Sequence, residues 1–411
     1  MDGERVVVIG GGAAGLGAAS TLVAAGVPTL LIEARHRLGG RAATSLAGGL
    51  PLDLGCGWLH SADRNPLVER ARAHGFTIDT TPAPWGGPSL TTGFPSAEQE
   101  TFAAASRAFW RRLDEAAAGP DGPAATCLEP GGRWNCLLDA VSTYINGAEL
   151  DRVSIHDFAA YEDTGTNWRV VEGYGAAIAA EGAGIPVELG CPVTLVDHRG
   201  PTIRLETARG TVPASAVIVT LPTSLIAAEA MRFLPALPDK VEAAAGLPLG
   251  LADKVYLALE DAEAFPAESR AFGRTDRAET GAYHVRPLGR PVIEGYFGGR
   301  CAAALEAEGA AGFAAFAVDE LAGLFGNAFR RRVRPLAVTR WQADPWARGS
   351  YSHALPGRAE ARARLAAPVD ERLFFAGEAC SPDFFSTAHG AYLTGVSAAR
   401  AAMKALGRAS S

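Results

Sequence analysis

The feature that most constrains the fold is a glycine-rich turn near the start of the chain, in the stretch VVVIGGGAAGLGAAS. A β-branched run precedes Gly10-x-Gly12-x-x-Gly15, and an alanine-rich segment follows it. This order predicts a βαβ unit whose glycines allow a tight turn, close approach of the backbone to a pyrophosphate, and close packing of helix on strand. Glu33 ends the next apolar run, where its carboxylate can bind a ribose diol. We therefore expect a parallel α/β domain that binds a dinucleotide, in preference to a glycine-rich turn without a ligand.

A second turn distinguishes between the two common dinucleotides. Gly39-Gly40-Arg41 follows Glu33 closely and brings a guanidinium next to the same phosphates. A bidentate arginine suits a permanently bound diphosphate, and a nicotinamide site has no need of this element. The two turns therefore favour FAD over NAD.

The composition excludes several classes of protein. A chain of 411 residues that is 48% hydrophobic can bury a large core, and its length favours two domains. The formal net charge of −7 argues against nucleic acid as a partner, and it is compatible either with a cationic substrate or with an ordinary acidic surface. The six cysteines are scattered, without a CxxC pair or a histidine cluster, which predicts free thiols in a reducing compartment and no metal site.

The stretch from Val6 to Ile32 contains no charged residue, as a membrane span would, but it includes six glycines and a proline. No basic segment or cleavage site precedes it, and the C-terminal GRASS matches no retention or lipidation signal. We therefore expect a cytoplasmic protein without a membrane partner.

Both ends of the chain resemble the flavin-dependent amine oxidase family. Residues 6–80 combine the glycine fingerprint, the acid-x-Arg, the Gly-Gly-Arg and the G-x-x-W-x-H turn of that family. Residues 374–395, FFAGEACSPDFFSTAHGAYLTG, resemble its returning strand and the helix that follows, whose N-terminus would point at the pyrimidine side of the flavin. The ST-x-HGA opening of this helix is most similar to that of spermine and acetylpolyamine oxidases.

The resemblance implies that the cofactor is FAD, and it assigns a set of cofactor-binding positions. These positions are Gly10, Gly12, Ala13, Ala14, Gly15, Glu33, Ala34, Arg35, Gly39, Gly40, Arg41, Gly55, Gly57, Trp58, Val193, Trp341, Gly377, Glu378, Thr387, Ala388, His389 and Ala391. Ser350 stands where monoamine oxidases have the cysteine that is linked to the flavin, so we expect non-covalent FAD. Ser61 is another departure, because polyamine oxidases commonly have glycine there.

The middle of the chain contains weaker signals. Lys254 lies in the apolar run LGLADKVYLAL, where a charge on an edge strand would be one interpretation and the family's lysine, bonded through water to flavin N5, is the other. Trp341 and Tyr351 match a family run near the flavin, although aromatic residues of this kind also simply pack in cores. Residues 191–222 resemble the family's segment near the adenine, and a generic β-meander explains their pattern equally well.

The reaction that the resemblance implies is transfer of a hydride from the carbon next to an amine nitrogen to the flavin. The imine then hydrolyses, and O2 is reduced to hydrogen peroxide. Tyr351 and Trp58 would form aromatic walls that lower the amine pKa by desolvation, His60 would bind an amine, and Lys254 would hold the water. We expect a polyamine or related aliphatic amine as substrate. The alternatives are a monoamine or amino-acid oxidase, a desaturase or porphyrinogen oxidase, and a non-catalytic flavoprotein scaffold.

The predicted fold has an α/β FAD-binding domain assembled from residues 1–80, 172–246 and 364–411. The intervening residues 81–171 and 247–363 would form an α+β substrate domain with a mixed sheet flanked by helices. Much of this second domain contains no recognisable motif, and the sequence does not indicate an oligomeric state.

Overall fold

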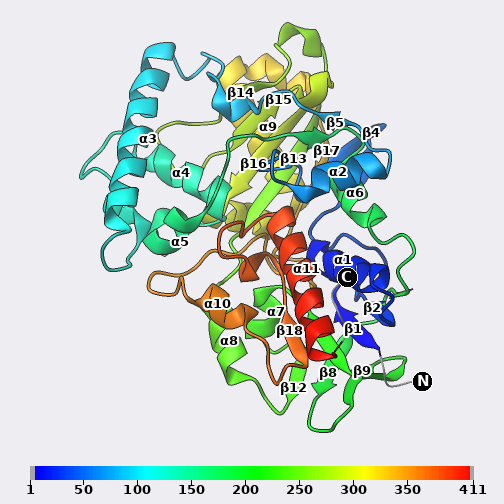
Figure 1. Ribbon diagram of the computed structural model, residues 1–411. Coiled ribbons are helices and arrows are strands. Elements are labelled where there is room, and N and C mark those ends of the chain that lie inside the picture. Colours follow the sequence, from blue (N-terminus) through cyan, green and yellow to red (C-terminus); the bar gives the residue numbers. More distant parts are fainter. Residues whose placement is uncertain (1–4, 408–411) are drawn as a thin grey trace.

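The computed structural model describes residues 5–407, which form two sheet-based domains stacked end to end (Figure 1). A parallel sheet and its helices occupy the lower part of Figure 1, and an antiparallel sheet with the longest helix occupies the upper part. The first strand and the last helix both belong to the lower domain, so the chain leaves this domain and returns to it.

The parallel sheet has the strand order β18-β11-β1-β2-β7, and all of its paired strands are parallel. Its strands are β18 (Leu373–Phe375), β11 (Ala216–Val219), β1 (Val6–Ile9), β2 (Thr29–Ile32) and β7 (Val187–Glu188). The three central members are rich in valine, isoleucine and leucine, and β1 and β11 are fully buried. Such continuous apolar strands are typical of a parallel sheet that is covered on both faces.

Helices α1 (Ala13–Ala24) and α11 (Ala388–Ala405) lie side by side on this sheet (Figure 1). Their contact depends on glycine. A Cβ on Gly395 would lie 1.9 Å from the carbonyl oxygen of Ala14, and a Cβ on Gly17 would lie 2.6 Å from a backbone oxygen of α11. Helix α1, which follows the glycine fingerprint, therefore packs closely against α11, the last helix of residues 5–407.

A four-stranded sheet extends the lower domain in the order β10-β9-β8-β12. Strands β8 (Val193–Asp197), β9 (Ile203–Thr207) and β10 (Gly210–Ala214) form an antiparallel meander, and β12 (Arg232–Leu234) pairs with β8 in parallel. The meander that the alternation predicted is therefore present. The short helices that pack near this sheet are α7 (Thr223–Ala227), α8 (Pro238–Ala245) and α10 (Ala361–Ala366).

The upper sheet has the order β14-β15-β16-β13-β17, and every pair in it is antiparallel. Its strands are β14 (Ser269–Phe272), β15 (Ala282–Val285), β16 (Val292–Gly298), β13 (Ala252–Leu259) and β17 (Val333–Val338). We expected a mixed sheet here. The short connections between β14, β15 and β16 explain the difference, because a parallel pair needs a crossover of about a dozen residues or more.

Helices surround the upper sheet. The longest, α9 (Gly299–Phe325), is interrupted at Gly309, whose φ is 82°. Within residues 5–407 it is also the one helix long and apolar enough to cross a membrane by length and composition. Phe313 and Leu321 of α9 belong to the core of the antiparallel sheet, as expected for the core helix of a globular domain.

The remaining elements connect or cover the two main sheets. The helices are α2 (Pro66–Ala73), α3 (Ser96–Ala116), α4 (Asn135–Asn146), α5 (Ile155–Ala160) and α6 (Tyr174–Ala180), and the short strand pairs are β3 (Thr44–Ala47) with β4 (Leu50–Asp53) and β5 (Ile78–Asp79) with β6 (Arg169–Val170). In Figure 1, α3, α4 and α5 lie together beside the upper sheet.

Candidate active site

A single large cavity extends from the glycine fingerprint of the lower domain to one face of the antiparallel sheet. Its volume is about 1320 Å³. Ligand pockets usually measure about 300–1,000 Å³, so this cavity has room for a dinucleotide and a second ligand. The alternation of side chains along the strands explains its position, because one face of the antiparallel sheet packs on α9 and the other faces the cavity.

Most of the residues that the sequence singled out line this cavity. The predicted cofactor-binding residues among them are Gly10, Gly12, Ala13, Ala14, Glu33, Ala34, Arg35, Gly39, Gly40, Arg41, Gly55, Gly57, Trp58, Val193, Trp341, Gly377, Glu378, Thr387, Ala388 and Ala391. The predicted substrate-side residues His60, Lys254 and Tyr351 line it as well. The fold therefore collects into one site residues that are more than 300 positions apart in the chain.

Two predicted cofactor residues, Gly15 and His389, do not line the cavity. A Cβ on Gly15 would lie 1.8 Å from the carbonyl oxygen of Gly10, so this glycine lets helix pack on strand. The His389 ring is buried against Phe384, at 4.8 Å between ring centroids. Burial, with a smaller contribution from His60, lowers the pKa of His389 to about 3, so its side chain is neutral.

The dinucleotide end of the cavity is built around the carboxylate of Glu33. This carboxylate accepts hydrogen bonds from the backbone N–H groups of Gly11 and Arg35, at 2.6 and 2.7 Å, and so holds the fingerprint turn against the second strand. Helix α1 begins after Gly12 with no side-chain cap and no acidic residue in its first turn. Its free N–H groups and positive dipole end suit a pyrophosphate. These residues therefore fit FAD.

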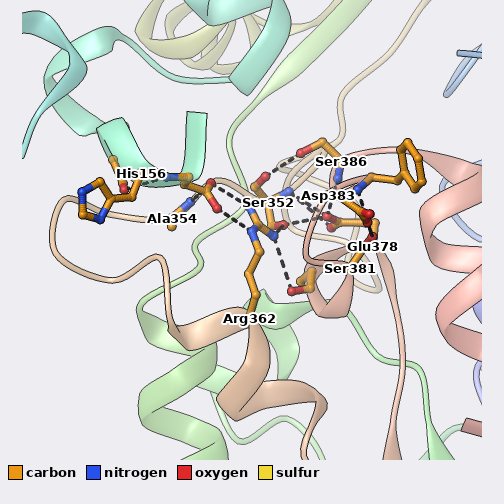
Figure 2. A network of polar contacts seen from close by, with 12 residues as sticks. His156, Ser352, Ala354, Arg362, Glu378, Ser381, Asp383 and Ser386 are labelled. Atoms are coloured by element: carbon orange, nitrogen blue, oxygen red, sulfur yellow. Dashed lines mark hydrogen bonds and ion pairs between the residues drawn. The ribbon is translucent and has the colours of Figure 1, made fainter. Parts of the chain in front are cut away.

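Glu378 is the centre of a polar network that joins the two domains (Figure 2). Its carboxylate accepts hydrogen bonds from Arg41, at 2.9 Å, and from the Ser352 hydroxyl, at 2.6 Å. Arg362 donates to that same hydroxyl and forms a buried ion pair with Asp157. Burial alone would raise the pKa of Glu378, but Arg41, Ser352 and Arg362 together hold it below its ordinary value. The charged network therefore stabilises the chain just after β18, where it faces the cavity.

Ser350 occupies the position at which the resemblance to monoamine oxidases would place a flavin-linked cysteine, and its side chain has no thiol. The Ser350 hydroxyl is tied to the backbone of Ala252, donating to its carbonyl and accepting from its N–H at 2.8 Å each. Cys56 and Cys191 line the cavity as free thiols. Burial raises the pKa of Cys56 to about 12, so this thiol stays protonated and is a poor nucleophile.

Lys254 lies on β13, between β16 and β17, so it is not on an edge strand. Its ammonium contacts the carbonyl oxygen of Asp53 at 2.9 Å and the carboxylate of Glu294 at 2.8 Å. Burial alone would lower its pKa, but Glu294 and two neighbouring tyrosines raise it well above the ordinary value. Lys254 is therefore a permanently charged donor beside the Gly57 turn, where a Cβ would lie 3.4 Å from its Nζ.

Aromatic side chains form the walls at this end of the cavity. Tyr351 donates to the carbonyl oxygen of Tyr144 at 2.6 Å, and its hydroxyl lies 3.1 Å from that of Tyr296. Trp58 contacts Trp85 edge to face, with ring centroids 4.5 Å apart. These walls exclude water and lower the local dielectric, which favours the neutral form of a bound amine.

His60 offers a hydrogen-bond acceptor to the cavity. Its Nδ1 lies 2.6 Å from the side-chain oxygen of Asn167, so Nδ1 carries the proton and Nε2 has a free lone pair. Burial lowers the pKa of His60, which keeps the ring neutral. The next residue, Ser61, has a φ of 47°, in the left-handed region that favours glycine. A serine thus occupies the conformation for which a glycine is the usual choice.

Sequence reasoning missed many of the cavity residues, including four polar residues on the cavity face of the antiparallel sheet. They are Arg270, His284, Glu294 and Tyr296. Strand register brings Arg270 opposite His284, and His284 opposite Glu294, so that they form a row across the sheet. The one available signal was charged or polar residues alternating with apolar ones in residues 269–298.

No group of three or more His, Cys, Asp or Glu side chains in residues 5–407 is arranged to hold a metal ion. The site is thus a dinucleotide cradle continuous with a desolvated, aromatic cavity that contains one fixed lysine. Such a site defines a flavin-dependent oxidoreductase that acts on a small organic molecule.

The comparisons with known proteins specify this class. The family model described as flavin containing amine oxidoreductase matches residues 130–403, and a model for an NAD(P)-binding Rossmann-like domain matches residues 8–73. The chain therefore belongs to the flavin containing amine oxidoreductase family. It is an FAD-dependent amine oxidoreductase.

Among similar proteins, polyamine oxidase 4 of Oryza sativa subsp. japonica is 29% identical over 96% of this chain and 87% of its own length. Polyamine oxidase 2 of Arabidopsis thaliana has the same identity and coverage. The solved structure of cyclohexylamine oxidase from Brevibacterium oxydans IH-35A covers 99% of this chain and 100% of its own, with a TM-score of 0.79 and 21% identity. A redesigned putrescine oxidase covers 98% of this chain and 99% of its own, with a TM-score of 0.78 and 19% identity. These two structures share the fold.

Proposed function

We propose that this protein oxidises an elongated aliphatic amine, the class to which the polyamines belong, with O2 as electron acceptor and hydrogen peroxide as product. The observation that carries the proposal is the position of Lys254, a charged donor held between the dinucleotide cradle and the aromatic walls. Two polyamine oxidases that are 29% identical over 96% of this chain support the substrate class.

FAD, when bound, would accept the hydride that leaves the carbon next to the neutral amine nitrogen, so that the amine would become an iminium ion, which water hydrolyses to an aldehyde and an amine with release of one proton to solvent. The amine must be neutral to release a hydride, although its pKa in water is about 10. Tyr351 and Tyr296 exclude water around it, and Nε2 of His60 can accept one of its N–H groups. Lys254, whose ammonium is fixed by Glu294 at 2.8 Å, would hold the water molecule that the family resemblance places at flavin N5.

The residues around Lys254 support a mechanism without a strong general base. Burial would raise the pKa of Glu294, but Lys254 and His284 hold it below the ordinary value, so this carboxylate is charged and committed to its ion pair. A general base that works near neutral pH needs a pKa near 7, which Glu294 does not have. Desolvation in the cavity therefore has to lower the pKa of the amine so that its nitrogen becomes neutral.

The test is anaerobic mixing of the FAD-loaded protein with amines. The panel is putrescine, spermidine, spermine, their N-acetylated forms and aromatic monoamines. Bleaching of the yellow flavin band by an aliphatic amine, followed by recovery of the colour and release of hydrogen peroxide in air, is the expected result. A flavin that stays yellow with every amine would exclude the proposal and leave a binding scaffold.

We also propose a cytoplasmic location. All six cysteines are free thiols in the described structure, which is the usual state in a reducing compartment. Cell fractionation with an antibody to the native protein tests this proposal.

A further inference from the structure

The antiparallel sheet presents to the cavity an arginine, Arg270, that has no counter-ion among residues 5–407. Arg270 lies on the edge strand β14 and lines the cavity. Its guanidinium lies over the ring of Phe272, with Cζ 4.2 Å from the centroid. Within residues 5–407, no carboxylate lies within ion-pair distance of Arg270 and no hydrogen bond is made by its side chain. Burial lowers its pKa to about 10, and the group still remains charged at neutral pH.

The neighbouring carboxylates on this sheet already have partners. Glu294 is paired with Lys254 at 2.8 Å. Glu268 is paired with Arg169 and with His284, at 2.7 Å each. These pairs leave the charge of Arg270 unbalanced.

The other charged residues of the cavity do not supply the missing partner. Glu100 and Arg107 of α3, together with Asp163, line the cavity and are exposed to solvent. Neither of these two carboxylates contributes to the pKa of Arg270, which responds only to burial and to Tyr144. An unpaired charge in a desolvated cavity is costly, so a ligand that neutralises the half-buried Arg270 would be favoured there.

The sheet register sets the distance between this charge and the reaction centre. Strand β14 is three strands away from β13, which carries Lys254. Neighbouring strands lie about 4.8 Å apart, so the two strands are separated by about 14 Å. A ligand that reacts beside Lys254 would therefore have to be elongated to reach Arg270.

We propose that Arg270 binds a carboxylate at the far end of the amine substrate, so that the preferred substrate is an elongated amino carboxylate. The planar guanidinium matches a carboxylate with two parallel hydrogen bonds, and the Phe272 ring holds its plane in position. A second ammonium, such as that of a polyamine, would be repelled at the same place. This inference rests on the proposed function, because it refines the substrate of the same cavity.

The first test measures binding without turnover. Straight-chain carboxylates of graded length, such as hexanoate, are titrated into the FAD-loaded protein, and the shift of the flavin absorption band reports their Kd. Arg270→Gln should raise the Kd by about 10- to 100-fold, the range expected for a lost charge-assisted hydrogen bond. Arg111→Gln is the matched control, because it removes the same charge from an exposed position of α3 outside the cavity lining.

The second test uses substrates. Matched ω-amino carboxylates, diamines and n-alkylamines of equal length are compared by anaerobic flavin reduction. The best amino carboxylate should exceed its matched diamine in kcat/KM. Arg270→Gln should raise KM for the amino carboxylate by about 10- to 100-fold, with kcat changed less than about threefold, since the contact is remote from the reacting carbon. The KM of Arg270→Lys for the amino carboxylate should lie between those of the unmodified protein and of Arg270→Gln, because lysine keeps the charge but lacks the planar guanidinium.

The outcomes separate the two proposals. Faster reduction by diamines, or a carboxylate Kd that Arg270→Gln leaves unchanged, would overturn the carboxylate site even if amines bleach the flavin. A Kd that depends on Arg270 while no amine bleaches the flavin would support the anion site and exclude the proposed oxidase function.

Discussion

The Nζ atom of Lys254 lies 2.8 Å from a carboxylate oxygen of Glu294 on the neighbouring strand. Each group shifts the pKa of the other toward the charged form, so both are ionised within a desolvated cavity. Removing either partner alone would leave the other as an uncompensated buried charge, at a cost of about 3–5 kcal/mol in stability. The function of the lysine must therefore be tested in a background where its partner is neutral.

The first prediction concerns Lys254→Met combined with Glu294→Gln. The pair of changes removes both charges and keeps the volume of the side chains. Loss of one preorganised polar contact at a reaction centre costs about 3 kcal/mol, so flavin reduction, reoxidation or both should slow by about a hundredfold. FAD content should not change. Stopped-flow measurement of both half-reactions provides the test.

Glu294→Gln alone is the control for that experiment. It keeps the lysine but removes its counter-ion, so this variant should be less stable, and in its folded, FAD-loaded fraction both half-reactions should stay closer to those of the unmodified protein than in the double variant. If the double variant matches the unmodified protein in both half-reactions, Lys254 has no role in the chemistry.

The second prediction concerns retention of the cofactor. Glu33→Ala removes the acceptor of the Gly11 and Arg35 N–H groups and should weaken FAD binding by about 1.5–3 kcal/mol. Turnover per bound flavin should change little, because the carboxylate lies at the dinucleotide end of the cavity. Equilibrium dialysis of FAD and the rate per loaded flavin measure the two quantities. An equal fall in both would contradict this role.

The third prediction is that FAD is not covalently attached. Ser350 cannot form a thioether, and the Cys56 thiol, with its pKa raised to about 12, is a poor nucleophile. Acid precipitation should release yellow FAD into the supernatant. Colour that remains with the precipitate would show a covalent link, and Cys56→Ser would then test that cysteine.

The fourth prediction concerns Asp253, whose carboxylate accepts hydrogen bonds from Thr339 and from the Trp341 N–H. Burial, followed by the hydrogen bond with Glu306, raises its pKa from the ordinary 3.8 to about 8. Between these two pH values the folded state binds more protons than the unfolded state, so this group lowers stability as the pH rises.

Asp253→Asn keeps the acceptor oxygen and replaces the proton with an amide N–H. Its Tm should therefore increase relative to that of the unmodified protein when the pH is raised from about 5 to about 8. Thermal unfolding at several pH values, followed by flavin fluorescence, measures the difference. A difference in Tm that does not depend on pH would show that Asp253 is ionised in the folded protein.

The dinucleotide end of the site could be predicted from the sequence because its geometry depends on local features. A strand, three glycines and an acid such as Glu33, in that order, predict a phosphate-binding turn from local sequence alone. The resemblance to the amine oxidase family also identified the returning strand before Glu378 and the buried lysine Lys254. Both line the cavity, although their roles remain predictions.

The substrate end could not be predicted, because it depends on strand register. Arg270, His284 and Glu294 form one row only through the pairing of three strands, and no local pattern encodes which residue faces which. Our prediction of a mixed sheet was also wrong. Whether neighbouring strands pair in parallel depends on the lengths of the connections between them, and this segment has no motif that indicates those lengths.

The close contact between α1 and α11 has a consequence for how the protein is made. Gly395 lies against Ala14, so the fingerprint helix obtains this neighbour only after residue 395 has been synthesised. The last strand of the parallel sheet, β18, is also synthesised late. A chain that ends before β18 and α11 would therefore lack part of the cofactor site.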